Sequence, residues 1–254
     1  MNRRHALLAL ASAQFLITPA RSEVPQPFKV SLLAGGQAGD LWQAGILVEL
    51  EPDWKTYWRV PGDTGIPPQF DWAGSTNVDA VDVMFPVPSR FRDVTGEAIG
   101  YHDQVLFPVS IKPQKAGDIV HLQLNMFFAV CKEICIPAKA KADLLLNSSS
   151  SNPLLASWQE RVPVADGTSP VSAARFEMIN NGPILVLTMA RAAEDIFVET
   201  ETLAYFGQPQ FDAVSGEARL PVWNVNDLAK LRNIPLKLTV SLGKTGIEQT
   251  LNVN

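Results

Sequence analysis

Residues 119–131 read IVHLQLNMFFAVC, and the alternation of polar and apolar side chains in this stretch decides the fold. In a β-strand, successive side chains point to opposite faces of the sheet. One face would carry Leu122, Leu124, Met126, Phe128 and Val130, and the other would carry His121, Gln123, Asn125, Phe127, Ala129 and Cys131. We therefore predict a half-buried strand over Ile119–Phe128, with Cys131 leaving it on the more polar face.

Shorter segments of the same character lie along the rest of the chain, with Gly, Pro, Asn or Asp residues close to their ends. They are residues 28–32, 45–50, 78–85, 105–111, 175–179, 184–189, 196–199, 218–222, 236–242 and 247–253. Many short strands separated by turn residues are typical of antiparallel β-sandwiches. No long segment has a 3.6-residue period, and no G-x-G-x-x-G or P-loop motif supports nucleotide binding.

A polar segment divides the chain near its middle. Residues 147–153 read NSSSSNP, a composition typical of a linker. We predict one β-sandwich domain over residues 23–146 and a second over residues 154–254. A short helix is expected over Pro153–Arg161, with Asn152 as its N-cap and Pro153 at its first position. Asp227–Arg232 is expected to form one or two helical turns.

The N-terminus has the features of a secretory signal peptide. Arg3 and Arg4 precede a mostly apolar stretch over residues 6–17, and Ala20-Arg21-Ser22 fits a small-x-small cleavage site. The apolar stretch is shorter than the roughly 20 residues of a membrane span. We therefore predict a signal peptide at residues 1–22 and a soluble, exported mature chain; the paired arginines leave both general secretory and twin-arginine export open.

Composition excludes several classes of function. Of the 254 residues 46% are hydrophobic and 19% are charged, as in a folded globular protein. The net charge is −5, and removal of residues 1–22 leaves 18 basic and 26 acidic residues, a net charge of −8. This charge argues against a nucleic-acid partner. Three histidines and two cysteines leave little material for a metal centre, so neither a cofactor nor a metal is expected.

The two cysteines, Cys131 and Cys135, are four positions apart in the segment FFAVCKEICIP, residues 127–137. Pro137 is expected to mark the end of a turn, because proline cannot extend a strand ladder. The sulfurs can bond only if the loop brings the two Cα atoms within about 7 Å. A bridge of this span constrains the unfolded chain by only about 2 kcal/mol, which favours a redox role over a structural one. A redox pair, a structural bridge and a pair of metal ligands all stay open at this point.

Several motifs, in the same order, resemble the periplasmic N-terminal region of the DsbD/ScsB thiol:disulfide interchange proteins. They are CKEICIP at residues 131–137, WKTYWRVPGDTGIPP at residues 54–68, FDW at residues 70–72, FPVPSRF at residues 85–91, and the stretch from Gly100-Tyr101 to Phe107-Pro108-Val109. The resemblance covers residues 28–146, and the later half is similar to the second extracytoplasmic β region of the ScsB-like branch.

The resemblance implies immunoglobulin-like domains and a cysteine pair that cycles between dithiol and disulfide. Cys135 matches the cysteine that forms the mixed disulfide with partners, and Cys131 matches the cysteine that resolves it. The implied partners are a thioredoxin-like electron donor and oxidised periplasmic thiol proteins. Because the family's membrane and thioredoxin domains are not in this sequence, the donor is expected to be a separate protein, and the chain is expected to be peripheral to the membrane at most.

Two departures from the better-known DsbD branch concern the cysteine site. That branch has a wider cysteine spacing and an aromatic cap over the pair, whereas Asp93–Gly96 contains no aromatic residue and Phe91 is only a nearby candidate. The family analogy also places Trp58-Arg59 beside the cysteine cleft. The alternative function is a non-catalytic periplasmic binding or assembly module, for copper handling or cytochrome c maturation, with a structural disulfide.

Overall fold

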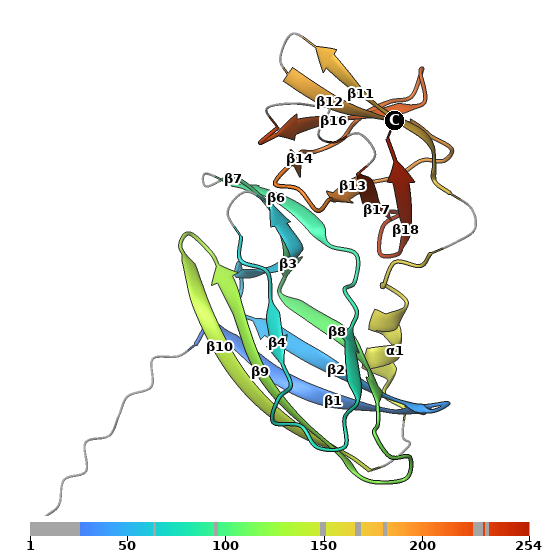
Figure 1. Cartoon of the computed structure of the whole chain (residues 1–254). Helices are drawn as coiled ribbons and strands as arrows, with labels where there is room; N and C mark the ends of the chain where they lie inside the picture. The colour runs from blue at the N-terminus through green and yellow to red at the C-terminus, as the bar shows by residue number, and fades with distance from the viewer. Residues whose placement is uncertain are drawn as a thin grey trace, which may run out of the picture.

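The structure, a computed structural model, describes residues 26–62, 65–93, 96–147, 151–165, 169–179, 182–225, 231 and 234–253. Its antiparallel sheets form two immunoglobulin-like β-sandwiches, which confirms the predicted all-β fold (Figure 1). The predicted signal peptide at residues 1–22 lies outside the described residues, as does most of the helical turn predicted at residues 227–232.

The first sandwich consists of two sheets from the N-terminal half of the chain. One has the order β1-β2-β8-β5, with β1 (Phe28–Ala38), β2 (Leu41–Leu50), β8 (Gln104–Lys112) and β5 (Ala80–Val83). The other has the order β10-β9-β3-β7-β6, with β10 (Cys135–Leu146), β9 (Val120–Cys131), β3 (Lys55–Gly62), β7 (Gly96–His102) and β6 (Ser89–Asp93), and β4 (Gln69–Asp71) also pairs with β9.

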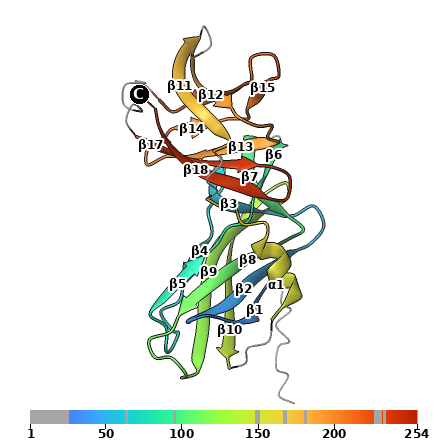
Figure 2. The ribbon, with the colours of Figure 1, turned by 90° about the vertical axis from the view of Figure 1, so that its right-hand side faces the viewer.

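The second sandwich consists of two smaller sheets. One has the order β11-β12-β16-β14, with β11 (Val171–Ile179), β12 (Gly182–Met189), β16 (Glu217–Trp223) and β14 (Tyr205–Phe206), and β15 (Gln210–Asp212) pairs with β16. The other has the order β13-β17-β18, with β13 (Asp195–Glu199), β17 (Pro235–Ser241) and β18 (Gly246–Asn252). In both views of the ribbon, this sandwich lies against the end of the first sandwich where β3, β6 and β7 are (Figures 1 and 2).

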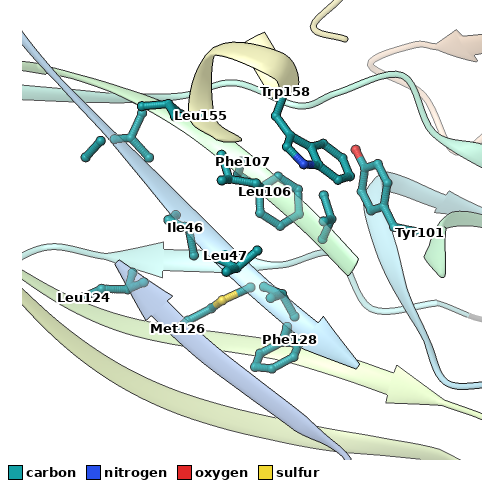
Figure 3. Packing of buried hydrophobic residues seen from close by; sticks show 14 of the residues in the cluster. Ile46, Leu47, Tyr101, Leu106, Phe107, Leu124, Met126, Phe128, Leu155 and Trp158 are labelled. Atoms are coloured by element: carbon teal, nitrogen blue, oxygen red, sulfur yellow. The ribbon is translucent and has the colours of Figure 1, made fainter. Parts of the chain in front are cut away.

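The predicted alternation of β9 places its apolar face in the core of the first sandwich. Leu124, Met126 and Phe128 are buried there, and they face Ile46 and Phe107 from the opposite sheet (Figure 3). A separate apolar cluster fills the second sandwich. Each sandwich thus buries a core of its own, although the predicted division into domains at residues 147–153 stays a prediction.

Helix α1 (Pro153–Gln159) is confirmed, with the predicted N-cap. The Asn152 side chain accepts hydrogen bonds from the backbone N–H groups of Leu154 and Leu155, at 3.0 and 3.3 Å. The buried side chains of the helix, Leu155 and Trp158, pack into the core of the first sandwich (Figure 3). With seven residues, α1 is too short to cross a bilayer, and no other helix in the described ranges has the length and apolar character to do so.

The predicted strands include β9 but none of the other strands of the cysteine-bearing sheet, which are β3, β4, β6, β7 and β10. Strand β3 was missed because it is buried on both sides, with Thr56, Tyr57 and Trp58 all inaccessible, so it shows no simple alternation. The prediction that Pro137 ends a turn is wrong, because Pro137 lies inside β10, opposite Ala129. Strand β10 is at the edge of its sheet, and an edge strand tolerates proline because its outer side has no ladder to interrupt.

Candidate functional site

The two cysteines face each other at the end of the β9–β10 hairpin. Cys131 is the last residue of β9 and Cys135 is the first of β10, and the strand register pairs them directly. Their Cα atoms are 4.2 Å apart and their sulfurs form a disulfide. The loop between them is only three residues long, so the strand pairing brings the sulfurs together without a contribution from distant parts of the chain.

The two cysteines differ sharply in their exposure to solvent. Cys131 is 2% exposed, whereas Cys135 is exposed at the rim of the sheet. Cys131 lies on the predicted face of β9, but the expectation that this face is polar fails at its end, where Ala129 is also buried. A protein that approaches the disulfide therefore meets Cys135 before Cys131.

Cys131 is buried because the neighbouring strands cover it from outside the main core. The small cluster around it contains Tyr57 from β3, Ala98 from β7 and the partly buried ring of Phe91 from β6. We call these three residues the sulfur cover. Phe91, the candidate for the missing aromatic cap, is therefore brought to the cysteine site, and its ring also contacts that of His102, with centroids 4.0 Å apart.

Tyr57 also contacts the exposed sulfur. Its hydroxyl oxygen is 3.1 Å from the Sγ of Cys135. Because a disulfide sulfur carries no hydrogen, the hydroxyl must be the donor. Gly100, opposite Tyr57 in β7, allows β3 and β7 to approach closely, since a Cβ at this position would lie 1.9 Å from the carbonyl oxygen of Thr56. The local sequence does not predict this contact, because it depends on the pairing of β3 with β9.

The surface beside Cys135 is apolar, with charges at its edge. Ile134 and Ile136 are 74% and 44% exposed, and a groove of about 310 Å³ beside them is lined by Trp54, Lys132, Glu133, Ile134 and Ile136. The charge of Lys132 is partly compensated, because its Nζ lies 3.0 Å from a carboxylate oxygen of Asp53. Asp53 balances the charge of Lys132, so the carboxylate of Glu133 leaves this surface with a net negative charge.

Other candidate residues lie away from this site. Trp58 and Arg59 do not line the cysteine cleft as the family analogy implied. Trp58 packs in the core against Phe197 of the second sandwich, and Arg59 forms ion pairs with two glutamates there. Among the described residues, no three His, Cys, Asp or Glu side chains are grouped as they would be to hold a metal ion.

The fold and the site together define a class of protein: an immunoglobulin-like β-sandwich domain in which a hairpin disulfide joins one buried and one exposed cysteine. The sequence profile of the family "Thiol:disulfide interchange protein DsbD, N-terminal" matches residues 22–147, and this half of the chain belongs to that family.

Comparison with solved structures shows the same fold over most of the chain. The crystal structure of the N-terminal periplasmic domain of ScsB from Proteus mirabilis superposes with a TM-score of 0.66 at 23% sequence identity. The match covers 88% of this chain and 92% of the ScsB chain, so it includes both sandwiches. No curated protein matches the sequence.

Proposed function

We propose that the chain is a periplasmic thiol:disulfide relay in which Cys135 forms the mixed disulfide with partners and Cys131 resolves it. The observation that carries the proposal is the unequal exposure of the two bonded cysteines, because Cys131 is buried and Cys135 is exposed. Membership of the DsbD N-terminal family and the likeness to a periplasmic ScsB domain support the reaction class and the compartment. A disulfide can persist in that oxidising compartment.

The relay consists of two exchanges, each of which moves two electrons and two protons. In the first, a thiolate of a dithiol donor attacks Cys135 Sγ, and Cys131 leaves as a thiolate. The second donor thiol then attacks the mixed disulfide, which leaves the donor oxidised and both cysteines of this chain reduced. In the second exchange, the Cys135 thiolate attacks the disulfide of an oxidised partner, and Cys131 displaces the reduced partner as the intramolecular disulfide forms again.

The partners are proteins on both sides of the relay. The donor is a separate thioredoxin-like protein or membrane thiol carrier, and the acceptors are oxidised periplasmic thiol proteins. The exposed apolar side chains of Ile134 and Ile136 beside Cys135 suit a protein partner, because the mixed disulfide would remove them from water. No cofactor is required, because the two sulfurs carry the electrons.

The direct test is to trap the mixed disulfide. With Cys131→Ser, the reaction should stop at a covalent complex between Cys135 and a thioredoxin-like partner, seen as a band that disappears on reduction. The control is Cys135→Ser, in which the remaining buried thiol should form no such complex. If neither variant is trapped and the reduction potential of the wild-type bridge lies below about −300 mV, the disulfide is structural and the alternative of a binding or assembly module is favoured.

A further inference from the structure

The three strands that supply the sulfur cover also contact the second sandwich. Successive side chains of a strand point to opposite faces, so a residue next to a cover residue points away from Cys131. In each strand, a residue next to the cover residue contacts the second sandwich. Trp58 lies next to Tyr57, Arg90 lies next to Phe91, and Glu97 lies next to Ala98. Both ribbon views show β3, β6 and β7 at this junction (Figures 1 and 2).

Arg90, next to Phe91, forms the centre of the junction. Its Nε and Nη2 donate to the two carboxylate oxygens of Asp195 at 3.0 and 3.1 Å, and Nη2 also donates to the carbonyl oxygen of Ile196. The guanidinium lies over the ring of Phe197, 5.2 Å from its centroid. Burial alone would lower the pKa of Arg90, but the hydrogen bonds and charges of Asp195 and Glu97 raise it above its ordinary value.

Glu97, next to Ala98, is a buried carboxylate shared by the two sandwiches. It accepts hydrogen bonds from Arg90 and from the hydroxyl of Tyr205 in the second sandwich. Arg92 of the first sandwich donates to its other oxygen at 3.2 Å. A buried charge is tolerated only when it is paired and hydrogen-bonded, so Glu97 depends on Tyr205 as well as on its own sandwich.

The third contact is next to Tyr57. The ring of Trp58 packs against that of Phe197, with centroids 5.6 Å apart. Arg59 donates to both carboxylate oxygens of Glu199, at 2.6 and 2.9 Å, and to Glu248 at 2.5 Å. Each strand of the sulfur cover is therefore fixed to the second sandwich within two residues of its cover residue.

We propose that the second sandwich is a positioning element that keeps the sulfur cover closed over Cys131. It acts through Arg90, Glu97 and Trp58, and it limits the access of thiols and oxidants to the buried sulfur while Cys135 stays open. The role of this device in electron transfer rests on the proposed relay function. The access of reagents to Cys131 can be tested whether or not that function holds.

The test measures the access of a small reagent to each thiol in the full-length protein after reduction by a phosphine. The variant is Asp195→Asn with Glu199→Gln, which removes two charges from the second sandwich without touching the cover. The control is Glu217→Gln, which removes the two ion pairs that Glu217 forms with Arg175 and Arg219 inside the second sandwich. Alkylation of each cysteine by iodoacetamide is followed by mass spectrometry.

We expect the junction variant to alkylate Cys131 at least about tenfold faster than the wild type and the control, because local opening governs access to a buried group. The rate at Cys135 should stay within about twofold. Equal Cys131 rates in all three proteins would overturn the proposal. If the double variant does not fold, Tyr205→Phe, which removes only the hydroxyl bonded to Glu97, gives the same comparison. A wild-type disulfide that never exchanges with dithiol proteins would refute the relay but leave this comparison intact.

Discussion

The hydroxyl of Tyr57 offers the sharpest test of the cysteine chemistry. It lies 3.1 Å from Cys135 Sγ, and the Tyr57 side chain is only 1% exposed, so water cannot take its place without a rearrangement. When the disulfide is reduced, the same hydroxyl can donate to the thiolate of Cys135 but gains less from the neutral thiol. The substitution Tyr57→Phe removes this preference for the thiolate and keeps the ring of the sulfur cover.

The magnitude follows from the energy of one hydrogen bond to a charged group. Such a bond contributes about 1.5 kcal/mol at the lower end of its range, which is appropriate for a sulfur at the surface. This corresponds to an about tenfold smaller thiolate fraction at neutral pH. The less stabilised thiolate is roughly threefold more nucleophilic, because nucleophilicity rises with basicity at a Brønsted slope of about 0.4–0.5. The net expectation is an about threefold slower attack on a disulfide at neutral pH.

The assay is the alkylation rate of Cys135 in reduced protein from acidic to alkaline pH. The midpoint of the profile should move to higher pH in Tyr57→Phe. The control is Tyr101→Phe, which removes a buried hydroxyl that donates to the carbonyl oxygen of Pro86, at 2.8 Å, and not to a cysteine. Burial holds the pKa of Tyr101 well above its ordinary value, so this hydroxyl is neutral. Superimposable profiles for Tyr57→Phe and the wild type would refute the role of the hydroxyl.

Three further predictions concern stability, each measured as a free energy of unfolding in urea. Burial alone would raise the pKa of Glu248, but hydrogen bonds and positive charge from Lys237 and Arg59 hold this pKa below its ordinary value of 4.5. The stability that this shift contributes should be present above pH 4.5 and be lost as the pH falls through the lower pKa of the folded state. A free energy of unfolding that does not change with acid would contradict this. Phe128→Ala should cost about 3–5 kcal/mol because it empties a fully buried site, whereas Phe211→Ala at the surface should cost far less. Asn152→Ala should cost about 1 kcal/mol through loss of the helix N-cap, and no change would show that α1 is held by packing alone.

The sequence predicted the features that depend on local patterns. The alternation along β9, the cap of α1 and the closeness of Cys131 and Cys135 all follow from neighbouring residues, and the structure has each of them. The site around the sulfurs was less accessible to prediction, because Tyr57 and Phe91 reach it through the pairing of strands far apart in the sequence.

The burial of Cys131 shows most clearly what the local pattern lacks. The alternation of β9 assigns Cys131 to the same face as His121 and Gln123. Those two residues are only partly buried, as expected for a polar face. At the Cys131 end, β3 replaces β4 as the neighbour of β9 and brings Tyr57 over the sulfur. Period two describes the two faces of a strand, but neighbouring strands determine whether a face is covered.

The pairing of β9 with β10 also supports the proposal that the cysteine pair changes its redox state within one fold. The ladder runs without a break from the cysteines to Leu146 opposite Val120, so it fixes the positions of Cys131 and Cys135 whether or not they are bonded. The five-residue ring adds only about 2 kcal/mol through chain entropy, which is small beside the core that Phe128 and its neighbours bury. A reduced Cys131 would remain in the sulfur cover as a small apolar side chain. We therefore expect that opening the bridge changes the chemistry at Cys135 while the sandwich keeps its shape, which is the property that the proposed exchange with partner proteins requires.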